Sequence, residues 1–483
     1  MVKQYSNLFL KKSNFKPMKF FIINLIVLLW FFSCSLHPPT MTNNGTTSFK
    51  RKINKILTDS NLNASFGIKI ISLKNNKILY EINSNKLFIP ASNIKLYTAL
   101  AALHYLGKKF IFKTSVLQNR KNLFLKGGGD PDLTLKQLDS LAIITAKKIK
   151  SVDTLFLDDT ILDSIHYGEG WMWDEGSWQY AAQIGALSVN NNCIDFFISP
   201  NQIGKPAIIN YNPQTEYISI INNSTTLKNS IDINKLTVDR EWRENKNHFT
   251  IAGSVYHNNG IDTLQRNIHD PTLFTGTLFK EFLKNLGIKI NYLTKKPVLK
   301  NLDTLSVHPS KPLLSSTKNL MNESDNLTAE LFIKTIGTNP KKEKNWKTGL
   351  DSLKTLLSDS VGIDTTKLRL ADGSGLSRYN LTSATQITLL LQWIFNSKYK
   401  DDFISTLPGG GWEGGTMEDR FKDEEDLIRV KTGSLSGVNN LSGYIYSPKY
   451  GPLAFSILIN GFVGSSKPFQ QLQTKIIQSL IYD

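Results

Sequence analysis

The sequence has few cysteines, few histidines and only one long apolar run. Its 2 Cys, Cys34 and Cys193, are too few for a disulfide scaffold or a cysteine-rich zinc module. Its 7 His form no H-E-x-x-H motif and no pair at metal-ligand spacing, so we predict no metal site. The single long apolar run excludes a protein built mainly of membrane-spanning helices.

Acidic residues are also too few to balance the basic ones. The 483 residues include 57 Lys and Arg against 40 Asp and Glu, which gives a net charge of +17. A nucleic-acid partner is one explanation of such a charge. Lysine is instead spread along the whole chain, with no dense basic run that contains aromatic residues, so we predict no nucleic-acid partner. Hydrophobic residues make up 40% of the chain, enough for a large core.

The apolar run lies near the N-terminus and indicates export from the cytoplasm. Residues Phe20–Phe32 follow several lysines and are fewer than the ~20 that a membrane span needs, as is typical of a signal peptide. Cys34 comes directly after, which resembles a bacterial lipoprotein site, although Phe31 stands where Leu is usual. We predict a signal peptide over residues 1–33, lipid attachment at Cys34, a flexible tether over 34–50 and a periplasmic or other extracytoplasmic, membrane-anchored location. A plain cleaved signal and an uncleaved anchor remain alternatives.

The apolar pattern of the remaining chain indicates one domain interrupted by an insertion. Residues 65–83 alternate apolar and polar side chains about a turn, which predicts a β-hairpin. Residues 92–107 have helical spacing. Short β-like runs with Asn and Gly turns fill 116–300; helical patterns follow, then strand-turn-strand and a final helix. We predict an α/β (α+β) domain from 51–115 and 301–483, and a mainly β accessory insertion between them.

Three short motifs occur in an order that indicates a nucleophilic serine. They match the S-x-x-K, S-D-N and K-T-G set of β-lactamases and penicillin-binding proteins. Alone, each motif is more often structural: a helix cap with a solvated lysine, a turn, or the end of a strand. Their joint occurrence, each in a suitable local context, favours catalysis. The motifs are Ser92-Asn93-Ile94-Lys95, Ser324-Asp325-Asn326 and Lys431-Thr432-Gly433, followed by Ser434.

The first two motifs supply the groups that an acyl transfer needs. A serine hydroxyl reacts poorly unless a base takes its proton. Ser92 and Lys95 share one face of a helix, so Lys95 is the candidate base if burial or a neighbouring cation lowers its pKa. The N–H groups of Ser92 and Ser434 are candidate oxyanion donors. Ser324 is a candidate proton relay to the leaving group.

The third motif supplies candidate groups for holding a substrate. Lys431, Thr432 and Ser434 can bind the carboxylate at a peptide C-terminus. Gly433 allows a substrate backbone to approach the strand closely. Asn326 can hold a substrate amide as well as the motif lysine. These residues together predict a peptide-binding site beside the serine.

Longer stretches of the sequence resemble one family, the D-alanyl-D-alanine carboxypeptidase/endopeptidase family of low-molecular-mass class C penicillin-binding proteins (peptidase family S13). The resemblance implies a penicillin-recognising core, an antiparallel sheet with helices on both faces, plus a large mainly β accessory insertion. It also implies that Ser92 forms an acyl-enzyme with peptidoglycan stem peptides or β-lactam antibiotics, without a cofactor. It extends over about residues 50–480, through PASNIKLYTALAAL, KGGGDPDLT, ALSVNNN, ESDNLTAELFIKTIG, ADGSGLSRYNLTSA, LPGGGWEGGT and VKTGSLSGVNNLSGY.

Two other functions remain open on the sequence alone. A β-lactamase-like hydrolase shares the motifs, but about 230 residues separate Ser92 from Ser324, far more than a compact β-lactamase has. A non-enzymatic peptidoglycan-binding lipoprotein is disfavoured because all three motifs are intact. Rapid deacylation of penicillin favours the first alternative, and failure to be acylated favours the second.

Two further features allow more than one interpretation. Trp171, Trp173 and Trp178 cluster in the insertion; they can stack on sugars, but we expect them to form the core of a small domain. The glycine-rich stretch 372–378 either shapes the floor of the active site or forms a structural turn.

Overall fold

The computed structural model describes residues 48–229, 234–298, 302–337 and 345–482. The predicted signal peptide, Cys34 and most of the predicted tether lie outside the described residues. Helix α2 (Ser48–Ser60) begins inside that tether, so its last residues are helical. Within the described part of the chain, no helix combines the length and the apolar character that a bilayer crossing requires.

The first sheet has five antiparallel strands in the order β14-β15-β16-β1-β2. The predicted hairpin forms β1 and β2, and the predicted C-terminal strands form the other three. Successive side chains point to opposite faces of a strand, so Ile70 packs on one face and Ile71 on the other. The strands are β14 (Ile428–Leu435), β15 (Val438–Ser447), β16 (Gly451–Asn460), β1 (Ser65–Ser72) and β2 (Ile78–Ile82).

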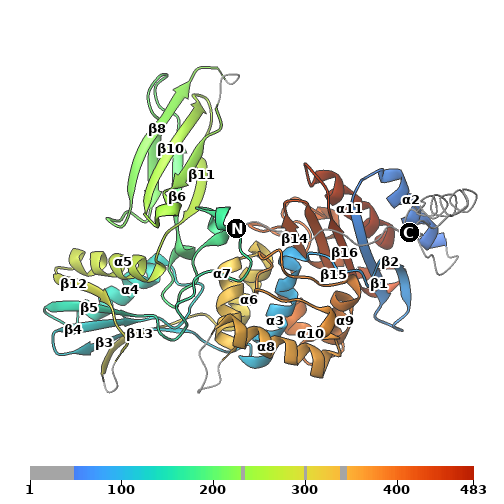
Figure 1. Ribbon diagram of the computed structural model, residues 1–483, viewed down its shortest axis with the longest axis horizontal. Helices are drawn as coiled ribbons and strands as arrows, with labels where there is room; N and C mark the ends of the chain where they lie inside the picture. Colours follow the sequence, from blue (N-terminus) through green and yellow to red (C-terminus); the bar gives the residue numbers. More distant parts are fainter. Residues whose placement is uncertain (1–47, 230–233, 299–301, 338–344, 483) are drawn as a thin grey trace, which may run out of the picture. The chain divides into compact units, whose positions relative to one another are not determined.

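Helices cover both faces of this sheet, as predicted (Figure 1). Helices α2 and α11 pack against one face, while α3, α9 and their neighbours form a larger core against the other. The apolar stripe of each helix provides these contacts, since helical residues three or four apart share a face. The bounds are α3 (Ile94–Tyr105), α6 (Leu313–Glu323), α7 (Asn326–Ile336), α8 (Trp346–Leu356), α9 (Ala384–Phe395), α10 (Lys400–Ile404) and α11 (Lys467–Ile481).

A second five-stranded sheet, in the order β12-β5-β4-β3-β13, forms the base of the insertion. It is mixed: β5 runs parallel to β4 and β12, whereas β3 is antiparallel to β4 and β13. Helices α4 and α5 share its apolar core. The elements are β3 (Lys113–Asn119), β4 (Asn122–Lys126), α4 (Leu135–Ala146), β5 (Val152–Asp158), α5 (Pro271–Asn285), β12 (Ile290–Lys295) and β13 (Asp303–Pro309).

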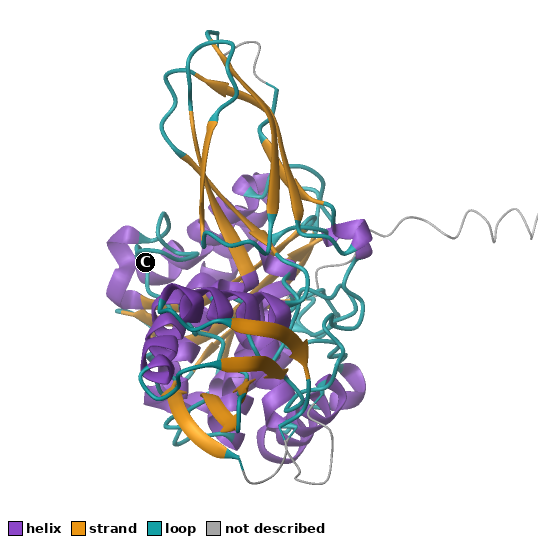
Figure 2. Ribbon diagram, turned by 90° about the vertical axis from the view of Figure 1, so that its left-hand side faces the viewer, coloured by secondary structure: helices purple, strands orange, loops and turns teal. Residues whose placement is uncertain are grey.

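Two three-stranded sheets, β8-β10-β9 and β11-β6-β7, form a part that we call the finger, residues 193–267. Figure 2 shows their long strands side by side. Phe196 and Phe249 pack together at 5.1 Å between ring centroids and belong to the same core as the base sheet. The strands are β6 (Cys193–Ser199), β7 (Ile208–Asn212), β8 (Ser219–Leu227), β9 (Thr237–Arg240), β10 (His248–Tyr256) and β11 (Asp262–Asn267).

Strand pairing places the end of the insertion later than the sequence predicted. Strand β13 lies beyond residue 300, yet all of its pairing is with β3, so this sheet ends at Pro309. The chain leaves the base after β5, builds the finger and returns through α5. The insertion is therefore nested, with the finger inside the base, and two helices accompany the predicted strands.

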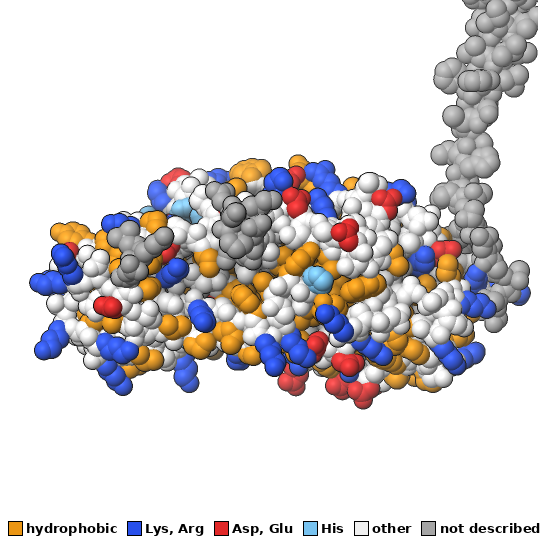
Figure 3. Space-filling model, turned by 90° about the horizontal axis from the view of Figure 1, so that it is seen from below, with side chains coloured by type: hydrophobic (Ala, Val, Ile, Leu, Met, Phe, Trp, Pro, Cys, Tyr) orange, Lys and Arg blue, Asp and Glu red, His pale blue; other side chains and the backbone are white. Residues whose placement is uncertain are grey.

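Basic side chains are dispersed on the face of the molecule shown in Figure 3. Lysine and arginine lie at separate points around that face, with acidic side chains between some of them. Apolar side chains lie across its middle. The net positive charge of the chain is thus not gathered into one patch on this face.

Candidate active site

Ser92 lies in a short turn at the start of the helix that carries its partner lysine. Residues Ala91–Asn93 form a 3-10 turn that continues into α3. Lys95 Nζ lies 2.9 Å from Ser92 Oγ, as the i, i+3 spacing predicts. Ala91 has a φ of 46°, a left-handed conformation that is costly for alanine. Such strain beside a reactive group is common in active sites, where the surrounding contacts hold it in place.

Lys95 is completely buried and is surrounded by uncharged oxygen atoms. Its Nζ also donates to Asn326 Oδ1 at 2.6 Å and to the Ser374 carbonyl at 2.8 Å. Burial lowers the pKa of Lys95 to about 8, against the opposing effect of three nearby carboxyl groups. These acids are Asp325, Glu330 and Asp372.

The contacts of Lys95 suit both of its protonation states. A charged ammonium has three hydrogens for three oxygen neighbours. A neutral amine keeps two donors, for Asn326 and the Ser374 carbonyl, and its lone pair then faces Ser92 Oγ. In that state the hydroxyl can donate to the amine, which is the geometry for proton transfer from serine to lysine.

The second motif lies where two helices meet. Ser324 ends α6 with a φ of 64°, and Asp325 caps α7 by accepting from Thr328 N at 2.6 Å. Asn326 is the first residue of α7, so the turn brings its side chain to Lys95. Its Nδ2 donates to the Tyr180 carbonyl at 2.8 Å, a contact with the segment that joins the base to the finger.

The third motif lies on β14, an edge strand of the first sheet. Asn93 joins this strand to the serine turn, because its Nδ2 donates to the Lys431 carbonyl at 3.0 Å. A Cβ at Gly433 would lie 2.6 Å from the Pro90 carbonyl oxygen. Glycine is therefore needed for the strand to approach the serine turn, a reason different from the substrate contact that the sequence suggested.

Lys431 is completely buried beneath that strand rather than open to the cleft. Its Nζ donates to the Thr432 carbonyl at 3.2 Å. Burial, and then the charge of Lys95, lower the pKa of Lys431 well below its usual range. Thr432 is also buried, whereas Ser434 is exposed.

A pocket of about 670 Å³ opens above Ser92. Of the eight active-site residues predicted from the sequence, Ser92, Ser324, Asn326 and Ser434 line this pocket. The other four do not: Lys95, Lys431, Thr432 and Gly433. The lining comes from all three motifs and from the insertion. It consists of Ser92, Ser324, Asn326, Ser434, Leu435, Ser436, Gly375, Leu376, Arg378, Met172, Asp174, Glu175 and Tyr180.

Glu330 is a buried carboxyl group that the sequence reasoning missed. Its oxygens accept from Trp346 Nε1 at 2.7 Å and from the backbone N–H groups of Gly373 and Ser374, both at 2.8 Å. Burial, and then the charge of Asp372, raise its pKa to about 7. Glu330 thereby fixes the backbone whose Ser374 carbonyl accepts a hydrogen bond from Lys95. A single glutamate in an ordinary helical pattern gives no signal of this role.

The glycine-rich stretch 372–378 is both a turn and part of the site. Asp372 accepts from Gly375 N at 2.8 Å and Ser377 N at 2.6 Å, which closes the turn. A Cβ at Gly375, whose φ is 86°, would lie 1.9 Å from the Ala91 carbonyl oxygen. The turn thus packs directly under the serine, and both alternatives that the sequence left open hold.

Taken together, a serine beside a buried lysine and an open strand edge define a serine-dependent acyl-transfer site. Comparison with known proteins gives the family. The chain belongs to the D-Ala-D-Ala carboxypeptidase 3 (S13) family, whose model matches residues 49–478.

Individual relatives match over nearly the whole described chain. A D-alanyl-D-alanine carboxypeptidase of an Actinomadura species is 31% identical over 445 residues, covering 86% of this chain and 82% of its own length. The crystal structure of penicillin binding protein 4 from Haemophilus influenzae has a TM-score of 0.77 and 26% identity, with coverage of 89% and 99%. The same protein complexed with a β-lactam gives a TM-score of 0.72 at 25% identity, with coverage of 89% and 100%.

Proposed function

We propose that this chain is a serine-type D-alanyl-D-alanine carboxypeptidase in which Ser92 is the nucleophile. The observation that carries this assignment is the 2.9 Å contact between Ser92 Oγ and the buried Nζ of Lys95, whose pKa is lowered to about 8. A fraction of Lys95 is then neutral at physiological pH and can take the serine proton.

The proposed reaction has two acyl-transfer steps. Lys95 takes the proton of Ser92, and Oγ attacks the carbonyl carbon of the penultimate D-Ala. The N–H groups of Ser92 and Ser434 stabilise the oxyanion. The peptide bond breaks, the terminal D-Ala leaves as an amine after gaining a proton by way of Ser324, and water hydrolyses the acyl-enzyme. A β-lactam ring would open onto the same serine.

Substrate holding is proposed for the edge strand and the second motif. Ser434, which lines the pocket, offers its hydroxyl group to the terminal carboxylate. Thr432 and Lys431, both buried, are proposed to support that carboxylate with a second hydroxyl group and a positive charge from within the strand. Asn326 offers its amide to the peptide. In a crosslink the D-Ala carbonyl is bonded to an amine of a diamino acid. A DD-endopeptidase reaction then uses the same groups, with that amine leaving in place of the terminal D-Ala.

We also propose that the mature chain acts outside the cytoplasm, attached to a membrane through Cys34. The support is the order of lysines, short apolar run and cysteine between residues 11 and 34. Metabolic labelling with a radioactive fatty acid tests this anchor. Label should enter the native chain, and Cys34→Ala should remove it; labelling that survives this change contradicts the proposal.

The enzymatic proposal is tested by labelling with a fluorescent penicillin, followed by peptide mapping of the acylated residue. The expected result is a stable adduct on Ser92, together with release of D-Ala from a pentapeptide ending in D-Ala-D-Ala. An adduct that hydrolyses within seconds would support a β-lactamase instead. Absence of any adduct would support a binding protein without activity.

A further inference from the structure

Aromatic side chains are exposed beside the catalytic pocket, on the segment that joins the base to the finger. Trp173 is 73% exposed, Met172 is 47% exposed and Tyr167 is 46% exposed. The expectation that the tryptophans form a small core is therefore wrong for Trp173. Contiguous exposed apolar surface that is rimmed by polar residues is typical of an interaction or ligand-binding site.

These side chains form a pocket of about 500 Å³ together with a turn of the finger. Trp173 faces Trp242, with ring centroids 5.3 Å apart and an angle of 48° between the planes. Trp242 begins a turn over Trp242–Glu244, between β9 and β10. A Cβ at Gly176 would lie 2.9 Å from Trp242 Nε1, so a glycine there lets the indole pack close. The two indoles thus come from separate parts of the chain and form two angled walls.

Polar groups lie beside these aromatic walls. The Arg243 guanidinium lies 4.9 Å from the ring centre of Trp242 and 5.9 Å from that of Trp173. Within the described residues the contacts of this guanidinium are with the two ring faces, so its N–H groups can bind a ligand. Glu175 and Asn245 also line the pocket. Aromatic faces with polar groups at their edges match a pyranose ring, which has C–H faces and hydroxyl edges.

The aromatic pocket adjoins the catalytic pocket. Met172 and Glu175 line both, so only this stretch of chain separates them. A four-residue peptide spans at most about 14 Å when extended. A stem peptide whose end lies at Ser92 therefore carries its sugar at most about that far from the serine. The aromatic pocket, which shares Met172 and Glu175 with the catalytic pocket, lies on that side of the site.

We propose that this aromatic pocket is a saccharide subsite that binds the glycan strand bearing the stem peptide. Trp173 and Trp242 stack on the amino-sugar rings, while Arg243, Glu175 and Asn245 bind their polar substituents. The proposal rests on the proposed function, because it takes the substrate to be a peptide attached to a glycan. It assigns the insertion a part in substrate choice rather than in chemistry.

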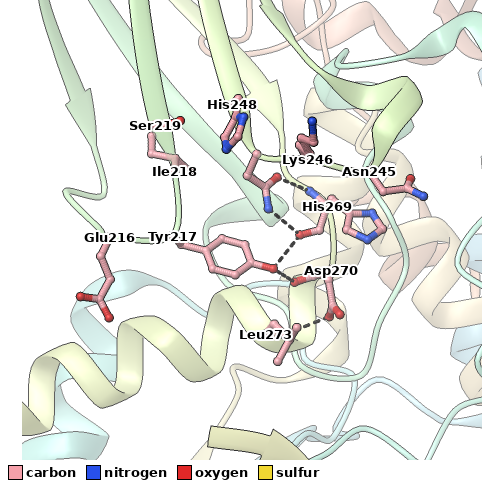
Figure 4. A pocket seen from close by; sticks show the side chains of 11 residues that line it. Glu216, Tyr217, Ile218, Ser219, Asn245, Lys246, His248, His269, Asp270 and Leu273 are labelled. Carbon is pink, nitrogen blue, oxygen red and sulfur yellow. Dashed lines mark hydrogen bonds between the residues drawn. The ribbon is translucent and has the colours of Figure 1, made fainter.

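A second pocket, which shares Asn245 with the aromatic pocket, differs from it in that its groups hold two parts of the protein together (Figure 4). In that pocket, of about 340 Å³, the hydroxyl group of Tyr217 points toward the backbone of His269 and Asp270. Tyr217 Oη donates to the carbonyl groups of His269 and Asp270 at 2.9 and 3.1 Å. The hydroxyl group of Tyr217 is therefore engaged by the protein itself. In the aromatic pocket, by contrast, Trp173 is 73% exposed and the guanidinium of Arg243 contacts ring faces rather than a carbonyl or carboxylate.

The first experiment compares kcat/KM for a disaccharide-pentapeptide with that for the free pentapeptide. The native enzyme should favour the sugar-bearing substrate by about tenfold, the effect of one or two stacked rings. Trp173→Ala and Trp242→Ala should each bring this ratio close to one. Tyr292→Ala removes an aromatic side chain that is 66% exposed on β12, away from the pocket, and should keep the native ratio. A native ratio of one, or a ratio unchanged in both tryptophan variants, overturns the proposal.

The second experiment separates this proposal from the proposed function. Tetra-N-acetylchitotetraose, a peptide-free amino-sugar chain, is titrated into enzyme with and without bound penicillin, and tryptophan fluorescence is followed. Saturable quenching in both forms, weakened at least fivefold in Trp173→Ala, supports a saccharide site whether or not the enzyme cleaves peptides. Absence of saturable binding at millimolar sugar overturns it, even if D-Ala release is normal.

Discussion

The catalytic region and the insertion depart from the usual distribution of side chains in opposite directions. The catalytic region encloses charged groups completely, whereas the insertion leaves aromatic groups on its surface beside the same pocket. The enclosed groups are Lys95, Glu330, Lys334, Asp372 and Lys431, and the exposed ones are Tyr167, Trp173, Trp178 and Tyr180.

Each departure has an energetic cost that indicates a different task. Burying a charge is unfavourable unless partners compensate, and burial lowers the pKa of Lys95 to about 8, a value suited to proton transfer. Exposing an indole leaves apolar surface in water, a cost that binding of a ligand removes. The difference suggests that chemistry is performed by the buried groups and that the insertion contributes recognition. The predictions below test the first half of that division, and the saccharide experiments test the second.

The largest effect is expected from removing the nucleophile. Ser92→Ala should abolish labelling by fluorescent penicillin, because among the serines that line the pocket Ser92 is the one whose Oγ lies 2.9 Å from the buried Lys95 Nζ. Ser465→Ala changes an exposed serine near α11 and should label as the native enzyme does. Gel fluorescence measures both, with circular dichroism as the check on folding. Full labelling of the folded Ser92 variant would falsify the assignment.

Replacing the buried lysine with arginine should have the next largest effect. Lys95→Arg keeps a positive charge, but guanidinium does not give up its proton, so the acylation rate should fall by ~10²–10⁴-fold. Stopped-flow acylation by penicillin measures the rate. Lys467→Arg, at an exposed position, is the matched control. A variant that acylates at the native rate shows that another group is the base.

The pH profile should follow the same lysine. Lys95 must be neutral to accept a proton, and its pKa is lowered to about 8. The acylation rate should therefore rise about tenfold per pH unit below pH 8 and level off above it. Second-order rate constants between pH 5.5 and 9.5 provide the measurement. A rate that is flat from pH 6 to 9 contradicts a base with this pKa.

Replacing Lys431 tests whether its buried charge acts on the substrate carboxylate. A hydrogen bond to a charged group contributes ~1.5–3 kcal/mol, and ~1.4 kcal/mol is tenfold. Lys431→Met and a C-terminally amidated peptide should each lower kcat/KM by at least about tenfold. Combined, they should cost little more than either alone, because they remove one interaction. If the two penalties multiply, Lys431 acts elsewhere, for example on the pKa of Lys95.

The smallest effect concerns Glu330 and stability. Its pKa in the folded chain is raised to about 7, so the folded state holds a proton that the unfolded state releases. The contribution of this group to the free energy of unfolding is fully present below its pKa in the unfolded chain, 4.5. It is lost as the pH rises toward 7, by on the order of 1 kcal/mol per pH unit. Glu330→Gln should remove this slope. Urea unfolding at pH 5 and 7 measures both proteins, and equal slopes contradict the prediction.

Local elements and motif spacing were predictable, whereas long-range pairings were not. The hairpin at 65–83 and the helix that carries Lys95 follow from side-chain periodicity, which depends on nearby residues. The pairing of β13 with β3 was missed because it joins positions far apart in sequence. Glu330 was missed for the same reason, since its partners at 373 and 374 come from a different segment. The exposure of Trp173 depends on the finger, whose position no local pattern specifies.

The hydrogen bonds of Lys95 also have a consequence for the dynamics of catalysis. Three oxygen atoms surround its nitrogen, and this arrangement can satisfy either the ammonium or the neutral amine. In the proposed mechanism, transfer from Ser92 then requires the movement of hydrogens, without rearrangement of these heavy atoms. In water, the solvent dipoles must reorient around each new charge, and this reorganisation is a large part of the barrier. Here the dipoles are oriented when the chain folds, so each catalytic cycle begins from a prepared environment.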